Sequence, residues 1–176
     1  MASNFHLAYL QDLRPVIEWS GYLELPMLEA TLFAFVLAHM PPYAAEGCNA
    51  RGGCDIPTVI TTDQRPAGPM PGTHTIGWAP PDRPRVIFVS SALKKGSPEW
   101  EEVVAHEMTH KVQQQLNKYP GYTLGNPCHK YLAEKEAYEV GEARLAMYNL
   151  VRKQINKNIE FYQLKCDAAR NAGLIK

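Results

Sequence analysis

Residues 101–112 read EEVVAHEMTHKV, a helix-forming stretch that contains a complete His-Glu-x-x-His pattern. Positions four apart lie on one face of a helix, so His106 and His110 can direct their imidazoles at one metal ion. Glu107 then lies beside the metal rather than facing it, where a general base must lie to take a proton from a water that the metal activates. The stretch therefore predicts two metal ligands and a candidate general base on one helix.

Helix signals before and after this stretch support the same prediction. Ser97 is a suitable N-cap residue, Pro98 suits the first helical position, and the acidic residues that follow favour the positive end of the helix dipole. No glycine or proline interrupts the helix before Pro120, and Asn117 with Lys118 provides a suitable end. The competing interpretation is a surface helix whose two histidines are solvated. It is disfavoured because the helical context that the motif requires is present.

A third metal ligand is expected downstream, because catalytic zinc sites have three protein ligands and an open position for water. Residues 130–150 are strongly helical in pattern and offer two candidates, Glu134 and Glu136. The face of Glu134 continues through Ala137 and Gly141, whose small size would let the two helices approach closely, whereas the face of Glu136 is half polar. Glu134 is therefore the preferred third ligand and Glu136 the alternative. Either could instead be a solvated carboxylate on a helix surface.

The two motifs together resemble the gluzincin clan of zinc metallopeptidases. In that clan, the third ligand is the glutamate of a Glu-x-x-Ala or Glu-x-x-Ser pattern, which residues 134–137 match here. The phrase His-Glu-Met-Thr-His-Lys-Val-Gln-Gln is especially similar to small bacterial and phage-borne members called minigluzincins. The resemblance covers roughly residues 84–145. It implies a zinc ion held by His106, His110 and Glu134, with Glu107 as the acid and base.

One position departs from the pattern of the family. Larger gluzincins often carry an aspartate four residues after the ligand glutamate, where it orients a histidine ligand from behind. That position is Tyr138 in this chain, and Glu139 or Glu142 could substitute for the missing carboxylate.

Composition sets wider limits on the function. The 176 residues, 45% of them hydrophobic, suit one domain spanning residues 1–176. The formal net charge of zero and the pI near 7.0 argue against a nucleic acid or an anionic lipid surface as partner. No apolar run approaches the roughly 18 residues of a membrane span, and the N-terminus lacks the charged and apolar regions of a signal peptide. We therefore expect a protein that is cytoplasmic or exported by a route that needs no signal peptide.

The remaining segments predict an α+β fold. A dense apolar run at residues 23–40 indicates a buried N-terminal helix, and residues 151–171 indicate an amphipathic C-terminal helix. Nine of the fourteen prolines fall in residues 41–84, and β-type runs occur at residues 57–62, 73–78 and 85–90. We expect a zincin-like arrangement, in which a small, mainly antiparallel sheet packs against the His-Glu-x-x-His helix and the helix of Glu134. An edge strand of such a sheet commonly accepts an extended peptide, although the sequence does not indicate which strand is the edge.

The four cysteines are Cys48, Cys54, Cys128 and Cys166, which allow three pairings that the sequence does not distinguish. Cys48 and Cys54 bracket a glycine-containing loop that is flexible enough to close a disulfide. A zinc knuckle formed by the first three cysteines with His129 is disfavoured, because the spacing matches no usual ligand pair. Free thiols or a structural disulfide are the simpler interpretations.

The turn-rich segment between the two predicted metal-binding helices supplies further candidates. Tyr119, Tyr122, His129 and Tyr131 could each hydrogen-bond the oxyanion of a tetrahedral intermediate. Each could also serve packing or lie at the surface, and the sequence does not choose among them.

Taken together, these residues predict a zinc-dependent peptidase that acts on a peptide or protein substrate, with Glu107 transferring the protons. One alternative is a metal-binding structural protein that serves a larger assembly, such as a phage particle. Another is an effector that cleaves a single host protein. An intact Glu107 argues against the structural alternative, because a structural metal site has no use for a general base.

Overall fold

The computed structural model describes residues 24–64, 66, 74–122, 125–151 and 155–175. Within these residues the chain forms, in order, α1 (Glu24–His39), α2 (Tyr43–Ala50), β1 (Thr58–Thr62), β2 (Gly77–Trp78), β3 (Val86–Ser90), α3 (Pro98–Gln115), α4 (Pro127–Ala146) and α5 (Ile155–Asn171). The chain is α+β, as the sequence predicts. None of the helices described is both long and apolar enough to cross a membrane.

Some predictions concern residues outside the described ranges. The N-terminal stretch that bears on a signal peptide is among them, as are residue 23 of the predicted first helix, residue 73 of the predicted second strand and residues 152–154 of the predicted last helix. The short helix α2 was not predicted.

The three strands form a mixed sheet in the order β1-β3-β2. β1 runs parallel to β3, with Thr58 opposite Val86 at the start of the pairing. β2 runs antiparallel to β3, with Gly77 opposite Val89. The prediction of a mainly antiparallel sheet is therefore wrong, because the longer of the two pairings is parallel. Alternation of apolar residues indicates which side of a strand faces the core but carries no information on strand direction.

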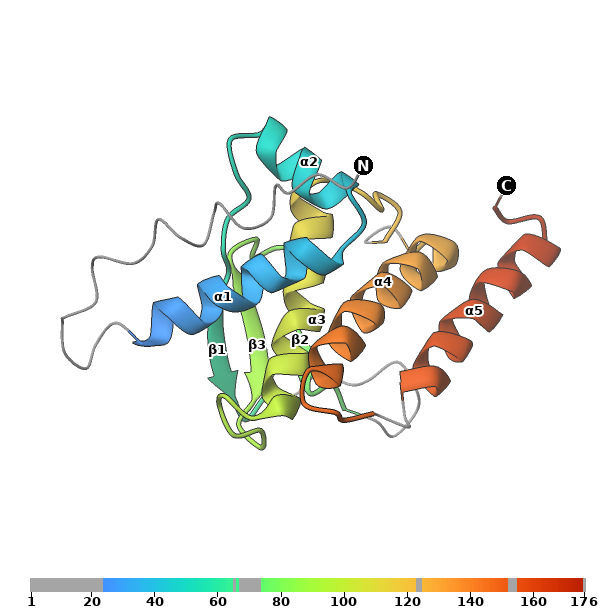
Figure 1. The fold of residues 1–176 in the computed structure, drawn as a ribbon. Coiled ribbons are helices and arrows are strands. Elements are labelled where there is room, and N and C mark those ends of the chain that lie inside the picture. Colours follow the sequence, from blue (N-terminus) through green and yellow to red (C-terminus); the bar gives the residue numbers. More distant parts are fainter. Residues whose placement is uncertain (1–23, 65, 67–73, 123–124, 152–154, 176) are drawn as a thin grey trace, which may run out of the picture.

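Side chains from α1, β3 and α3 build the main core. On β3, Ile87 and Val89 are fully buried while Val86 and Phe88 are half-buried, so the strand has one side that faces the core. Other fully buried members of the core are Leu32, Val36, Trp100, Val104 and Met108. The sheet, α1 and α4 all pack against α3, and α5 packs on α4 as the outermost layer (Figure 1).

α3 begins and ends as the sequence predicts. Ser97 is the N-cap residue, its Oγ accepts a hydrogen bond from the backbone N–H of Trp100 at 3.3 Å, and Pro98 is the first helical residue. After the helix, Asn117 adopts a φ of 49°, the left-handed conformation in which asparagine is common. Every residue from 100 to 113 is buried. The His-Glu-x-x-His helix is therefore the central helix of the fold and not a surface helix.

Two disulfides connect the helices to their surroundings. Cys48 at the end of α2 pairs with Cys54 in the following loop, and Cys128 in the first turn of α4 pairs with Cys166 on α5. All four cysteines are thus in disulfides, which excludes both free thiols and the cysteine–histidine zinc knuckle. The second disulfide ties α5 to the helix that carries Glu134.

Candidate metal centre

α4 lies close enough to α3 for side chains of the two helices to meet around one point. A Cβ atom added to Gly141 would already be in van der Waals contact with the backbone oxygen of Glu102, at 3.4 Å. Ala137, one turn earlier on α4, is fully buried. The small residues predicted for this interface are therefore where the helices approach, and the approach brings Glu134 across to α3.

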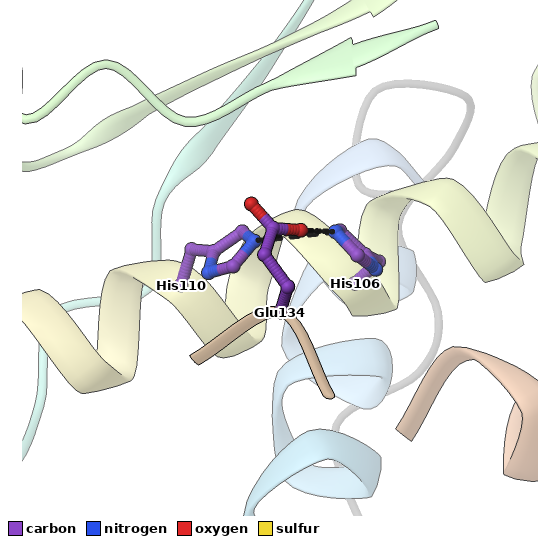
Figure 2. A group of neighbouring side chains, drawn as sticks. All are labelled: His106, His110 and Glu134. Carbon is purple, nitrogen blue, oxygen red and sulfur yellow. Dashed lines mark hydrogen bonds and ion pairs between the residues drawn. The ribbon is translucent and has the colours of Figure 1, made fainter. Parts of the chain in front are cut away.

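Three side-chain atoms from these helices converge (Figure 2). Nε2 of His106 and Nε2 of His110 lie 3.2 Å apart, and each lies 3.5 Å from Oε2 of Glu134. The three residues are buried, with exposed fractions of 9%, 5% and 7% respectively. The three atoms thus form a nearly equilateral triangle inside the protein.

The size of this triangle fits a tetrahedral metal site. Nitrogen and oxygen ligands lie about 2.0–2.1 Å from zinc, which places tetrahedral ligands roughly 3.3 Å from one another. The separations of 3.2 and 3.5 Å agree with that value. Two imidazoles and one carboxylate are also a donor set that binds zinc and related divalent ions. The group of His106, His110 and Glu134 could therefore hold a metal ion.

Comparison with protein-family models, with curated protein sequences and with solved structures finds no match to this chain. The candidate centre is therefore assigned from the residues of this chain and their geometry.

Glu107 lies beside the triangle and beneath β2. It is 7% exposed, and a Cβ atom added to Gly77 on β2 would lie 2.7 Å from its Oε1. Burial raises the pKa of Glu107, and the neighbouring His106 and His110 act in the opposite direction. A carboxyl group whose pKa is raised suits a residue that must both accept and return a proton.

The ligand candidates are electrostatically coupled. Burial lowers the pKa of His110, but the carboxylates of Glu134 and Glu107 and the hydrogen bond with Gln113 together outweigh this effect and raise the pKa to about 9. Burial raises the pKa of Glu134, but His110 and His106 outweigh it and bring this pKa well below its usual range. Without a metal ion, an imidazolium and a carboxylate therefore stabilise each other at neutral pH. A divalent cation would replace the proton between them.

Two of the ligand candidates are also held by tyrosines. The ring of Tyr138 meets the ring of His106 edge-on, with centroids 4.4 Å apart. The hydroxyl of Tyr122 donates to Oε1 of Glu134 at 3.1 Å, which leaves Oε2 directed at the two imidazoles. These contacts restrict the rotation of both side chains.

Glu139 and Glu142, the two carboxylates that could have replaced the aspartate expected four residues after Glu134, are not part of the candidate metal centre. Tyr138 itself fills the position, and its hydroxyl accepts a hydrogen bond from Nδ2 of Asn158 at 2.7 Å. Glu139 and Glu142 are exposed, and Glu139 pairs with Lys135 on the surface of α4. The ring of Tyr138, and neither Glu139 nor Glu142, therefore contacts His106 from this part of α4.

Glu136, the alternative third ligand, lies in a different set of contacts. Its Oε2 accepts hydrogen bonds from the hydroxyl of Tyr43 at 2.6 Å and from Nε2 of Gln113 at 2.7 Å. Gln113 also lies 2.9 Å, through its Oε1, from Nδ1 of His110. Neither Gln113 nor Tyr43 was predicted as a site residue. Only the position of Gln113, three residues after a ligand candidate and so on nearly the same helix face, could have indicated it.

A cavity of about 180 Å³ opens beside His110. The rest of its wall consists of polar uncharged, proline and alanine residues, namely Pro81, Gln113, Gln114, Asn117, Tyr119, Pro120, Tyr122 and Ala133. Of the oxyanion candidates, Tyr119 and Tyr122 belong to this wall and Tyr131 does not. Nδ1 of His129 instead accepts a hydrogen bond from the backbone N–H of Gly121. Burial raises the pKa of Tyr119 to about 12 and also raises that of Tyr122, so both remain protonated donors at neutral pH.

Lys111, next to His110, is fully buried and points away from the centre into the turn between β2 and β3. Its ammonium donates to the backbone oxygens of Pro80 at 2.5 Å and Arg83 at 2.9 Å, and to Oε1 of Gln114 at 3.1 Å. Burial lowers the pKa of Lys111 to about 8. Three acceptors for its three donors account for a lysine inside the protein.

Proposed function

We propose that this protein is a zinc-dependent peptidase. The observation that carries the proposal is the triangle of two imidazole nitrogens and one carboxylate oxygen, together with a buried glutamate directly beside it. His106 and His110 from α3 and Glu134 from α4 would hold the zinc ion. The order of these residues along the chain also resembles the gluzincin clan.

The chemistry divides between the ion and the side chains. A zinc ion, when bound, lowers the pKa of water and polarises a carbonyl group. Glu107 accepts the proton of the attacking water and returns it to the nitrogen of the leaving amine. Glu107 is suited to this exchange because burial raises its pKa. Tyr119, in the cavity wall beside His110, is the candidate to donate a hydrogen bond to the developing oxyanion, because the hydroxyl of Tyr122 already donates to Glu134.

The position of β2 supports a peptide or protein as the substrate. This strand is at one edge of the sheet and lies against Glu107 through Gly77. An extended peptide that pairs with an edge strand gains backbone hydrogen bonds irrespective of its sequence. A peptide added to β2 would have its backbone next to Glu107, which favours peptide bonds as the bonds to be cleaved.

The test compares three purified variants with the wild type, with metal content and cleavage of a peptide library measured on each. We expect Glu107→Gln to retain zinc and lose hydrolysis, because the amide cannot accept the proton. His106→Ala should lose the metal as well as the activity. Glu139→Gln, which alters an exposed carboxylate on α4, is the control and should resemble the wild type. Undiminished cleavage by Glu107→Gln would refute the peptidase proposal. Zinc binding without any cleavage by the wild type would favour the metal-binding assembly protein.

A further inference from the structure

We propose that Gln113 and Glu136 form a positioning relay behind the metal centre, which fixes the proton of His110 on Nδ1. The proposal rests on the metal site in the proposed function, and it does not depend on the reaction catalysed there. It gives a role to the buried carboxylate of Glu136, which is not in the group around the metal position.

The amide of Gln113 lies between two helices, α3 and α4. Gln113 is 4% exposed, and its Nε2 donates to the backbone oxygen of Ala133 at 3.0 Å and to Oε2 of Glu136 at 2.7 Å. Its Oε1 lies 2.9 Å from Nδ1 of His110. The side chain thus uses both of its N–H donors on α4 and directs its oxygen at a histidine of α3.

These contacts determine which way the amide points. A backbone carbonyl and a carboxylate are both acceptors, so only the NH₂ group of Gln113 can face them. The amide oxygen must then face His110, and because an amide oxygen only accepts, Nδ1 must carry the proton. Nε2 of His110 is consequently the nitrogen left to bind a metal. It is the atom that lies 3.5 Å from Oε2 of Glu134.

Glu136 is in turn held from α2. The hydroxyl of Tyr43 donates to the same Oε2 atom at 2.6 Å, and the ammonium of Lys118 lies 4.1 Å from the centre of the Tyr43 ring. The carboxylate of Glu136 is 7% exposed, so these donors are its replacement for water. A fixed acceptor at this position keeps the Gln113 amide from rotating, and the relay therefore orients the imidazole through an intermediate side chain.

The role predicts a loss of metal affinity from substitutions that leave all three metal ligands in place. Gln113→Met keeps the length of the side chain and removes both the amide oxygen that faces His110 and the N–H groups that donate to α4. We expect it to weaken Zn²⁺ binding about 10- to 100-fold, the range found when partners of metal-bound histidines are removed. Glu136→Leu should weaken binding in the same direction. Glu136→Gln should recover most of the affinity, because its amide oxygen can still accept from Gln113.

The experiment measures Zn²⁺ affinity by competition with a chromogenic chelator, on the full chain. The control is Glu139→Gln, which removes a carboxylate from the exposed face of the same helix. A second readout is the ring ¹H–¹⁵N signal of His110 in the zinc-loaded protein. We expect a slowly exchanging Nδ1–H in the wild type and in Glu136→Gln, and its loss or rapid exchange in Gln113→Met. A merely structural role would change the melting temperature without moving this signal.

Each result bears on the proposal. Wild-type affinity and an unchanged Nδ1–H signal in Gln113→Met would overturn the relay and leave the proposed function intact. Equal losses of affinity in Gln113→Met and in the Glu139→Gln control would also overturn it, because they would show a general effect of substitutions in these helices. If the wild type itself binds no Zn²⁺, the proposed function fails, and the relay fails with it. Should Gln113→Met not fold, Tyr43→Phe removes one hydrogen bond from Glu136 and should produce a smaller loss in both readouts.

Discussion

A Cβ atom on Gly77 would lie 2.7 Å from Oε1 of Glu107 and 2.5 Å from Cγ1 of Val103. The strand at the edge of the sheet therefore passes directly over the candidate general base. Real Cβ atoms do not approach other atoms so closely, so any side chain here must displace the strand, Glu107 or both. The close approach relates the position of the proposed peptide-binding edge to the position of the proposed catalytic group.

The first prediction concerns this contact. Gly77→Ala should reduce peptide cleavage by about 100-fold, because a shift of about 1 Å in a catalytic group can have that effect. Zinc content should not change, since the atoms nearest to the new methyl group belong to Val103 and Glu107 and not to a metal ligand. Thr58→Ala, on the exposed face of β1 at the opposite edge, is the control. Wild-type turnover by Gly77→Ala would contradict the assigned position of Glu107.

The second prediction is that zinc affinity depends on pH through His110. Without metal, the pKa of His110 is raised from 6.5 to about 9, so a proton must leave Nε2 before zinc binds at neutral pH. Affinity should therefore increase about tenfold for each pH unit until the pH approaches 9. Titration with Zn²⁺ in a weakly buffered solution at neutral pH should release protons. An affinity that stays constant across this range would contradict the ion pair between His110 and Glu134.

The same shift predicts how the stability of the metal-free protein changes with pH. The folded pKa of His110 lies above its unfolded value, so this group stabilises the folded protein fully below about pH 6.5. That contribution is lost as the pH rises through about 9. Urea denaturation of the chelator-treated protein should show the decrease. His110→Gln should make the curve flatter over this interval, and an equally steep curve in that variant would assign the effect to another group.

The third prediction compares the two disulfides. Cys128 and Cys166 are 38 residues apart in the sequence, whereas Cys48 and Cys54 are 6 apart. Loop-closure entropy assigns about 4 kcal/mol to the longer loop and about 2 kcal/mol to the shorter one. Replacing Cys128 and Cys166 by serine should therefore lower the free energy of unfolding more than replacing Cys48 and Cys54. Chemical denaturation of the two double variants gives the comparison, and a reversed order would show that strain or residual structure dominates.

The fourth prediction concerns a buried ion pair at the end of the helix interface away from Glu134. Oε2 of Glu101 on α3 accepts from Nε and Nη2 of Arg144 on α4 at 2.9 and 2.6 Å, and also from the hydroxyl of Tyr148 at 2.6 Å. The side chains of Arg144 and Glu101 are only 11% and 6% exposed. Removing one partner of such a pair costs about 3–5 kcal/mol, because the other charge stays buried. Glu101→Leu should show that loss in urea denaturation.

The matching double variant separates the pair from the packing around it. Glu101→Leu combined with Arg144→Leu removes both charges, and it should be more stable than Glu101→Leu alone. If the loss in free energy of unfolding of the double variant equals the sum of the losses of Glu101→Leu and Arg144→Leu, the two residues do not interact. Because the ligand candidates come from both helices, the single variant should also weaken Zn²⁺ binding.

Local signals in the sequence were sufficient for the helix of the candidate centre. The N-cap Ser97, the proline after it and the spacing of His106 and His110 all act within a few residues, and each is found as predicted. Glu134 was preferred over Glu136 as the third ligand because small residues lie on its face of the helix. Gly141 does lie in close contact with α3, so the packing argument identified the correct face.

Features that depend on distant parts of the chain were not predictable in the same way. Whether β1 runs parallel or antiparallel to β3 depends on how the chain crosses from one edge of the sheet to the other after β1. No short stretch of the sequence encodes that crossing. The contact of Tyr43 with Glu136 joins residues 93 apart in sequence, and it turns a ligand candidate into part of the relay. Lys111 gave no sign of its burial, because two of its three acceptors are backbone oxygens, which every residue carries.

Lys111 also has a consequence for how a substrate could enter. Lys111 follows His110 on α3, and its ammonium donates to two backbone oxygens in the turn between β2 and β3. These hydrogen bonds join the turn to α3. The edge strand β2 and the central helix α3 are thus fixed to each other from inside. We expect the edge of β2 to keep a constant position relative to Glu107 during turnover, so that a substrate must adopt its extended shape before it pairs with this strand.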